Sequence, residues 1–223
     1  DISFELPAGK TLGIMGATGA GKTSIVNLLM RFFDVNKGSV KLDGVDVKEL
    51  KLEQIRSNVS TVMQDVFLFS DTIEENIKMG QRETMEDPTM VHAAELAQAK
   101  NFIEEMPSEY NTIIGERGVG LSGGQKQRIS IARAIAKHNP ILVMDDSTSA
   151  LDMETEYEIQ KALDTLQDTT KIIIAHRISA VRRADEIIFL ENGKIKERGT
   201  HEELMAQKGL YYETYQLQYG GAN

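Results

Sequence analysis

The stretch Gly16-Ala17-Thr18-Gly19-Ala20-Gly21-Lys22-Thr23 decides the fold of this 223-residue chain. It matches the pattern G-x-x-x-x-G-K-[S/T], whose glycines let backbone N–H groups converge on phosphate oxygens. The apolar run Thr11–Met15 precedes it and the helical pattern Thr23–Phe32 follows, which is the strand–loop–helix context that the motif requires. The simpler alternative is a glycine-rich turn. The Lys-Thr pair at the correct positions favours a phosphate-binding loop, here called the P-loop.

The P-loop predicts the chemistry of a nucleotide site. The helix N-terminus after the loop adds partial positive charge, Lys22 would reach the β- and γ-phosphates, and the Thr23 hydroxyl would bind Mg²⁺. The expected nucleotide-binding residues are Gly16, Ala17, Thr18, Gly19, Ala20, Gly21, Lys22, Thr23 and Ser24. A second Mg²⁺ ligand is expected at Asp145, because it ends the apolar strand Ile141–Met144 and ligands bind at the carboxyl ends of such strands. The alternative is an Asp that caps the next helix.

Short apolar strands alternate with helical patterns along the chain, which predicts a mostly parallel α/β sheet. Several strands are apolar almost throughout, as expected of strands buried on both faces. Asn192-Gly193 lies between two strand-like runs and predicts a hairpin turn. The expected strands are Ile2–Leu6, Thr11–Met15, Ser39–Leu42, Val59–Met63, Ile141–Met144, Lys171–Ala175, Glu186–Leu190 and Lys194–Glu197. The expected helices are Thr23–Phe32, Asp152–Leu166 and Ser179–Arg183, with the cluster Tyr211, Tyr212 and Tyr215 on a further helix against the core.

Residues 71–137 differ from the rest because they show helix starts and no convincing strand. Thr72 and Glu75 form a capping-box pattern, and Asp87-Pro88 places a cap residue before Pro at the first helical position. Leu121-Ser122-Gly123-Gly124-Gln125 contains a second capping box. A well-capped helix explains it locally, but two glycines are costly at a helix start. Bare N–H groups at that positive end would admit a phosphate.

The composition of the chain excludes several classes of protein. Hydrophobic residues make up 41% and charged residues 26%, which is ordinary for a globular domain. A net charge of −9 argues against a dedicated nucleic-acid binder. The absence of cysteine excludes a disulfide framework and a thiolate metal site. No apolar run approaches the roughly 20 residues of a membrane span. The chain begins at Asp1 without Met inside an expected strand, so we expect a fragment of a longer protein.

The order of the motifs resembles that of an ATP-binding-cassette (ABC) nucleotide-binding domain over essentially the whole chain. These motifs are the P-loop, Gln64, Leu121–Gln125, Asp145, residues 149–152 and His176. The resemblance implies an α/β fold: a P-loop NTPase core with a mostly parallel sheet, a small antiparallel β part and an inserted α-helical subdomain. It implies one domain over residues 1–223, with a RecA-like core at 1–70 and 138–223 and the helical subdomain at 71–137. The N-terminal strands and the transmembrane domain would lie outside this chain.

The resemblance also implies roles for individual residues. Two such domains pack head to tail, and the signature of one closes over the ATP in the P-loop of the other. The signature residues are Leu121, Ser122, Gly123, Gly124 and Gln125, and those of the D-loop are Ser149, Ala150, Leu151 and Asp152. Gln64 would contact Mg²⁺ and the attacking water, and His176 would contact the γ-phosphate. Without the other motifs, a Gln after a strand reads as an ordinary loop residue. His92, His138 and His201 lack such a context, so we expect solvated or structural roles.

Asp146 departs from the family pattern, which usually has Glu directly after the Mg²⁺-binding Asp. The missing methylene withdraws the carboxylate by about one C–C bond, ~1.5 Å. Because a ~1 Å misplacement can cost roughly 10²-fold in rate, we expect a degenerate site that holds ATP and hydrolyses it slowly. With its signature intact, the chain resembles one half of a heterodimer whose partner carries Glu at this position. A homodimer with two slow sites is the alternative.

Three segments resemble those of exporters: Asp65–Ile77, the X-loop Gly115–Gly118 and Gly199–Leu204. In exporters the X-loop touches the coupling helices of the transmembrane domain. The resemblance therefore implies an ATPase at the cytoplasmic face of a membrane, although the isolated fragment would be soluble. The adenine-stacking aromatic residue would lie upstream of Asp1, so we expect weaker ATP binding by the fragment. The alternatives are a soluble ABC ATPase acting on nucleic acid or ribosomes and a regulatory ATP-binding module.

Overall fold

The computed structural model describes residues 2–220, and packing divides the chain into two compact units. Unit 1 comprises residues 1–60, 139–145 and 168–223, and unit 2 comprises residues 61–138 and 146–167. The subdomain assignment made from the sequence stays a prediction. The units drawn by packing have different bounds, because residues 146–167 group with the helical segment.

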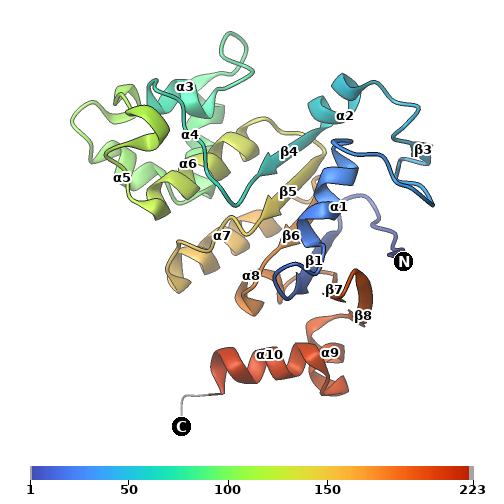
Figure 1. The fold of residues 1–223 in the computed structure, drawn as a ribbon. Coiled ribbons are helices and arrows are strands. Elements are labelled where there is room, and N and C mark those ends of the chain that lie inside the picture. Colours follow the sequence, from blue (N-terminus) through green and yellow to red (C-terminus); the bar gives the residue numbers. More distant parts are fainter. Residues whose placement is uncertain (1, 221–223) are drawn as a thin grey trace. The chain divides into compact units, whose positions relative to one another are not determined.

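The main sheet has six strands in the order β4-β5-β6-β1-β7-β8 (Figure 1). Their bounds are β1 Thr11–Gly16, β4 Val59–Val62, β5 Ile141–Asp145, β6 Thr170–Ile174, β7 Glu186–Glu191 and β8 Lys194–Gly199. β1 pairs in parallel with β6 and β7, and β5 pairs in parallel with β6. β8 is antiparallel to β7 through Asn192 and Gly193, whose φ angles of 51° and 71° suit a type I′ turn. The mostly parallel sheet and the hairpin are confirmed.

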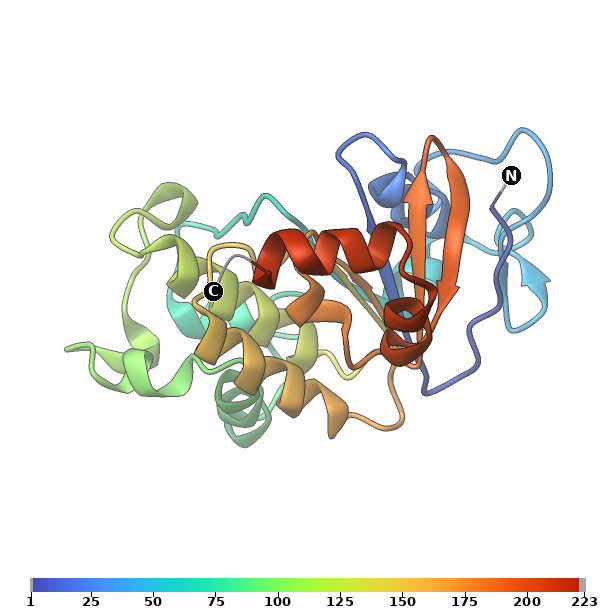
Figure 2. The ribbon, with the colours of Figure 1, turned by 90° about the horizontal axis from the view of Figure 1, so that it is seen from below.

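Helices cover both faces of the sheet in unit 1, which explains the near-continuous apolar strands. Successive strand residues point to opposite faces. Leu12 and Ile14 therefore belong to one core cluster, with Val26 of α1 (Lys22–Leu29), whereas Met15 belongs to another. The second cluster contains residues from three C-terminal helices of unit 1, which Figure 2 shows in orange and red: α8 Ile178–Val181, α9 His201–Gln207 and α10 Leu210–Tyr219. At Gly13 a Cβ atom would lie 2.8 Å from Cβ of Val181, so α8 approaches β1 closely.

Several expected elements of unit 1 differ in the structure. The expected strand Ile2–Leu6 is wrong, because these residues pair with no strand among those described. Its apolar alternation arises from packing, since Ile2, Phe4 and Leu6 are partly buried against the core. Ser39–Leu42 shortens to β2 (Lys41–Leu42), which forms a small antiparallel sheet with β3 (Val45–Asp46). The helix α2 (Leu52–Asn58) was not predicted, since only Ile55 of its residues is buried.

Unit 2 is built mainly from helices. The long α6 packs against α3 and α4, and α4 also contacts α7. The helices are α3 Ile73–Ile77, α4 Asp87–Leu96, α5 Lys100–Glu104, α6 Gly123–Ala136 and α7 Met153–Asp164, with 3₁₀ turns at Glu109–Asn111 and Glu116–Gly118. In the part of the chain that the structure describes, no helix combines the length and apolar character needed to cross a membrane.

The helix starts of unit 2 partly match the sequence. The Thr72 hydroxyl accepts a hydrogen bond from the Glu75 N–H, as expected. The N-cap of α4 is Glu86 and not Asp87, because Asp87 is already helical and its carboxylate lies 2.5 Å from Nζ of Lys78. That ion pair, together with one from Glu74, holds a nearly buried ammonium and raises the pKa of Lys78.

Candidate functional site

The P-loop connects β1 to α1 within unit 1, and its glycines take backbone conformations that other residues rarely adopt. The φ angles of Gly16, Gly19 and Gly21 are 145°, 81° and 102°. A Cβ atom at Gly16 would also collide with the carbonyl oxygen of Leu190 on β7. Gly21 is the N-cap of α1 and supplies no side chain to cap it. No side chain therefore competes with a ligand at this cap, which leaves the positive end of the helix to an anion.

Lys22 lies across the P-loop. Its side chain is only 6% exposed, and its Nζ donates to the carbonyl oxygens of Gly16 at 2.7 Å and Ala17 at 3.0 Å. These bonds hold a positive charge within the loop itself. A phosphate there would replace neutral carbonyl partners with charged oxygens, which form stronger hydrogen bonds with an ammonium.

Thr23 and Asp145 meet as the sequence predicts. Thr23 is the second residue of α1, and its Oγ1 donates to Oδ2 of Asp145 at 2.8 Å. Asp145 is 3% exposed and ends β5. A hydroxyl and a carboxylate are the hard oxygen donors that Mg²⁺ prefers, so the residues fit this ion. Among the described residues, no group of three or more His, Cys, Asp or Glu side chains is arranged to hold a metal ion.

His176 reaches the same edge of the sheet as the P-loop and Asp145. It follows β6, which lies between β1 and β5, and all three strands are parallel. The Ala175 N–H donates to the Ile14 carbonyl at 3.2 Å, which keeps the end of β6 in register with β1. The carboxyl ends of parallel strands meet at one edge, where α/β proteins bind ligands. Unit 1 thus brings the P-loop, Asp145 and His176 together.

The signature segment opens α6 in unit 2. Ser122 Oγ accepts from the Gln125 N–H at 3.2 Å, and Gln125 Oε1 accepts from the Ser122 N–H at 2.9 Å, so the capping box is confirmed. The two glycines have a second physical reason besides an open helix end. A Cβ at Gly124 would lie 3.3 Å from the carbonyl oxygen of Ala150, and one at Gly123 would lie 3.5 Å from its Cβ. The glycines let the signature approach the D-loop closely.

A buried glutamine that sequence reasoning missed, Gln127, ties the signature helix to the D-loop. Gln127 is 5% exposed, and its Nε2 donates to Oγ of Ser149 at 3.2 Å while its Oε1 accepts from the Ala150 N–H at 3.0 Å. The D-loop then leads into α7, where Asp152 caps the helix by accepting from the Thr155 N–H. This bond lowers the pKa of Asp152. The only local signal for Gln127 is a polar residue on the buried face of a helix.

Gln64 and Asp146 belong to unit 2, and their roles stay predictions. Gln64 is exposed in a bend two residues after β4. Asp146 follows Asp145 directly and is partly buried, with a φ of 46° in the left-handed region. A residue other than glycine held in this region costs free energy, and such residues cluster at functional sites.

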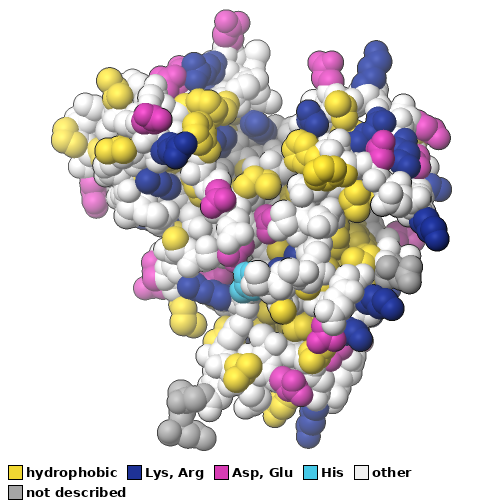
Figure 3. All heavy atoms as spheres, viewed as in Figure 1, with side chains coloured by type: hydrophobic (Ala, Val, Ile, Leu, Met, Phe, Trp, Pro, Cys, Tyr) yellow, Lys and Arg dark blue, Asp and Glu magenta, His cyan; other side chains and the backbone are white. Residues whose placement is uncertain are grey.

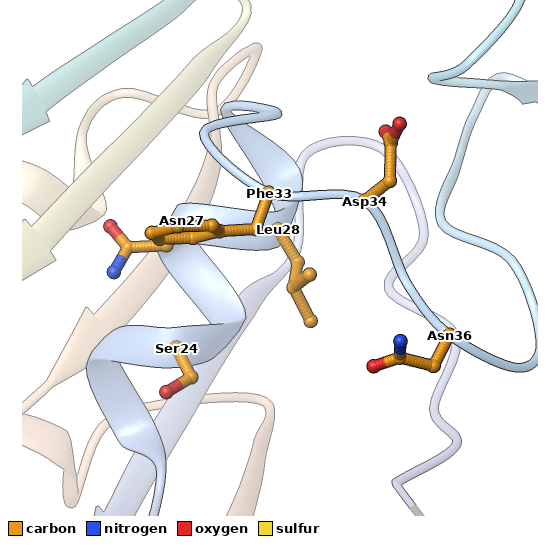
Figure 4. A pocket seen from close by; sticks show the side chains of 6 residues that line it. All are labelled: Ser24, Asn27, Leu28, Phe33, Asp34 and Asn36. Carbon is orange, nitrogen blue, oxygen red and sulfur yellow. The ribbon is translucent and has the colours of Figure 1, made fainter.

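A pocket in unit 1 adjoins the end of the P-loop (Figure 4). Its lining residues are Ser24, Asn27, Leu28, Phe33, Asp34 and Asn36. Ser24 was a predicted nucleotide-binding residue, whereas no motif marks the other five. Phe33 is 68% exposed, so the pocket offers an aromatic ring together with amide donors and acceptors.

Exposed apolar side chains lie on or beside the two predicted exporter segments of unit 2, and Figure 3 shows yellow surface in this part of the molecule. They are Phe67, Phe69, Ile113 and Val119. Arg133 holds the first of these segments, because it donates to the Phe67 carbonyl at 3.0 Å and to Asn76 Oδ1 at 2.8 Å. Burial lowers the pKa of Arg133 to about 10. A contact of this surface with coupling helices stays a prediction.

The family model described as "ABC transporter" matches residues 1–149, which is more than half of the chain. Over 221 residues the chain is 49% identical to the protein named "ATP-dependent lipid A-core flippase" of Sodalis glossinidius (strain morsitans), covering 99% of this chain and 38% of that protein. It is also 49% identical over 221 residues to "Uncharacterized ABC transporter ATP-binding protein YknU" of Bacillus subtilis (strain 168), covering 98% of this chain and 37% of that one. The chain thus spans about two fifths of these relatives' length.

A solved structure gives the same answer at the level of the fold. The structure titled "Structure of a bacterial Atm1-family ABC exporter with ATP bound" is similar with a TM-score of 0.93 and 39% sequence identity, covering 100% of this chain and 39% of that one. The P-loop and the contact between Thr23 and Asp145 indicate a nucleotide site, and the relatives are ABC transporter proteins. The chain belongs to the ABC transporter family, as an exporter-type nucleotide-binding domain with ATPase activity.

Proposed function

We propose that this domain is the motor of an ABC exporter and lies at the cytoplasmic face of a membrane. ATP binding would close a dimer of two such domains, and hydrolysis would reset it, while coupling helices transmit the movement to a transmembrane domain. One observation carries the ATP site: Oγ1 of Thr23, the last residue of the P-loop, lies 2.8 Å from Oδ2 of Asp145. The exporter relatives support the motor role, because in them such a domain forms part of a longer transporter chain.

Phosphoryl transfer is catalysed mainly by positioning and by electrostatic stabilisation. Each residue of the site can be given a role on this basis. The N–H groups of the P-loop and α1 hold the phosphates, and Lys22 neutralises charge on them. Thr23 and Asp145 would hold Mg²⁺ together with Gln64, and the ion neutralises charge on the phosphate oxygens. Asp146 orients the attacking water as general base, and His176 contacts the γ-phosphate from the end of β6.

The dimer is proposed because two helix starts that are predicted to bind phosphate occur in separate units. α1 starts in unit 1 behind the P-loop, whereas α6 starts in unit 2 with Ser122 and Gly123 exposed. An exposed, positively polarised helix end suits the phosphates of a second molecule's ATP. Each copy would then supply the P-loop for one nucleotide and the signature for the other.

The finer proposal is that the site containing Asp146 is slow and that the dimer partner carries Glu at the matching position. The support is chemical: the Asp carboxylate reaches ~1.5 Å less far than that of Glu. Binding should change little, because the phosphate contacts belong to the P-loop. A homodimer with two slow sites remains the second candidate.

The variant Asp146→Glu tests this proposal at saturating Mg²⁺-ATP and high protein concentration. We expect the steady-state rate to rise at least about tenfold, because a misplacement near 1 Å costs up to roughly 10²-fold. Asp146→Asn is the matched control, since it removes the charge without changing the length. Equal rates for the natural protein and Asp146→Glu would show that Asp146 is a competent base. Native mass spectrometry of the purified full-length transporter then separates a heterodimer from a homodimer.

A further inference from the structure

The segment that carries His176 is held by a residue of the last described helix, Gln218 on α10. Gln218 Nε2 donates to the carbonyl oxygen of His176 at 2.7 Å, and its Oε1 accepts from the Ile178 N–H at 2.9 Å. One side-chain amide thus bonds the backbone on both sides of Arg177. An amide used at both ends defines position and rotation together, as the paired bonds of a β-ladder do.

The helix that presents Gln218 is itself fixed to unit 1. At its start, the N–H groups of Leu210 and Tyr211 both donate to the carboxylate of Glu197 on β8. The Tyr211 side chain is fully buried, and its hydroxyl lies 2.7 Å from Nδ1 of His201. α10 also contacts α8, beside which Figure 2 shows it. Gln218 is therefore attached to a packed helix.

We infer that Gln218 is a positioning residue that acts on ATP hydrolysis through His176. The inference rests on the proposed role of His176 at the γ-phosphate. His176 lies beyond the last pairing of β6, so its own strand does not fix its backbone. Its side chain is exposed, so little packing fixes it either. The Gln218 amide replaces the missing strand bonds and makes α10 part of the machinery that orients the histidine.

A purely structural alternative exists, because Gln218 Oε1 also caps the short helix α8 at Ile178. The two roles use different ends of the amide. The acceptor oxygen serves the helix cap, whereas the donor nitrogen holds the His176 carbonyl. A carboxylate at position 218 keeps the acceptor and removes the donor, so Gln218→Glu separates them.

The test is ATP hydrolysis by the full-length transporter in lipid nanodiscs, with Gln218→Ala, Gln218→Glu, His176→Ala and the double variant Gln218→Ala/His176→Ala. Gln216→Ala is the matched control, because Gln216 is exposed on the same helix and its side chain bonds no other described residue. We expect Gln218→Ala and Gln218→Glu to lower kcat about three- to tenfold, with KM for ATP within about twofold, as for one or two lost hydrogen bonds. Gln216→Ala should match the natural protein.

The kcat of the double variant distinguishes a positioning role of Gln218 from a purely structural one. If Gln218 acts through His176, the double variant hydrolyses ATP as slowly as His176→Ala alone. An added loss in the double variant, or recovery of kcat by Gln218→Glu, would overturn the inference in favour of a structural cap. A loss with His176→Ala but none with Gln218→Ala overturns this inference alone. No loss with His176→Ala overturns the proposed role of the histidine and the inference with it.

Amide hydrogen exchange supplies a measurement on the folded protein itself. Gln218→Ala should speed exchange at the Ile178 N–H, whereas Gln218→Glu should keep it protected. Unchanged protection in Gln218→Ala would show that the bonds to Gln218 do not hold this segment in solution, which contradicts the inference.

Discussion

Two helices of this domain begin at predicted phosphate sites, and they begin in opposite ways. α1 starts after Gly21, which caps it with no side chain, and its first residue Lys22 carries the charge. α6 starts at Ser122, whose capping box uses both the hydroxyl and the Gln125 amide. The N–H groups at a helix start can thus be left without a side-chain cap and available to a ligand, as in α1, or bonded by the helix's own side chains, as in α6. We expect α1 to depend on nucleotide for its stability and α6 to be stable without it.

The largest expected effect is at the open helix start. Lys22→Ala should lower ATP hydrolysis by roughly 10²–10³-fold, because it removes a preorganised positive charge from the phosphate site. Lys37→Ala is the control, as an exposed lysine in the same unit. Steady-state ATPase assays over a range of ATP concentrations measure the effect. A loss no larger than that of Lys37→Ala would show that α1 does not serve phosphate.

The next effect concerns the backbone that keeps α1 open. Gly16→Ala should reduce the free energy of unfolding by about 3–5 kcal/mol, because it adds a collision with Leu190 to an unfavourable φ. Gly19→Ala should cost only about 1 kcal/mol, since its φ is also positive but its Cβ would meet open space. Urea denaturation at neutral pH measures both values. Equal costs would mean that φ alone, and not the approach to β7, requires the first glycine.

Nucleotide should stabilise the domain through the α1 start. At a Mg²⁺-ATP concentration of 100 times Kd, the free energy of unfolding should rise by about 2.7 kcal/mol. Chelation of Mg²⁺ should remove part of this gain, because Thr23 and Asp145 would lose the ion between them and the phosphates. In Lys22→Ala the gain should nearly vanish, and in Ser122→Ala it should persist in the monomer. Chemical denaturation with and without nucleotide measures this rise in the free energy of unfolding. An equal rise in Lys22→Ala and Ser122→Ala would contradict the proposed difference between the starts of α1 and α6.

The smallest effect tests the completed helix start. Ser122→Ala should cost about 1 kcal/mol of stability through the lost cap. Thr200→Ala is the matched control, because Thr200 and Glu203 form the same capping box at α9. The two variants should lose similar stability, but only Ser122→Ala should also reduce ATP hydrolysis by the assembled transporter. If Thr200→Ala reduces the rate as much, the effect of Ser122 is structural and α6 serves no nucleotide.

The sequence predicts the parts of the site that depend on local pattern. The P-loop, Asp145 and His176 each follow an apolar strand, and parallel strands bring their carboxyl ends to one edge, so their proximity could be anticipated. The capping boxes at Thr72 and Ser122 are equally local, and the Ser122 box forms in full, whereas only the hydroxyl bond forms at Thr72. Element ends were less certain: α1 ends at Leu29, where the pattern favoured Phe32.

What could not be predicted depends on contacts between distant segments. Gln127 bonds residues that lie more than twenty positions away, and Gln218 bonds residues forty positions away. Neither leaves a periodic signal in the sequence. The pocket lined by Ser24 likewise forms from α1 and the loop after it, and its other lining residues belong to no motif. The extended segment after Asp1 shows the reverse failure, because alternation at Ile2, Phe4 and Leu6 indicates burial but cannot indicate a pairing partner.

The Gln127 amide joins the helix α6 directly to the D-loop. Because Gln127 lies on α6 and bonds both Ser149 and Ala150, the D-loop cannot be displaced without straining these bonds or moving α6 with it. The two elements are in direct contact, and no third element is needed to connect them. One buried side chain, Gln127, therefore makes the signature helix and the D-loop parts of a single hydrogen-bonded unit.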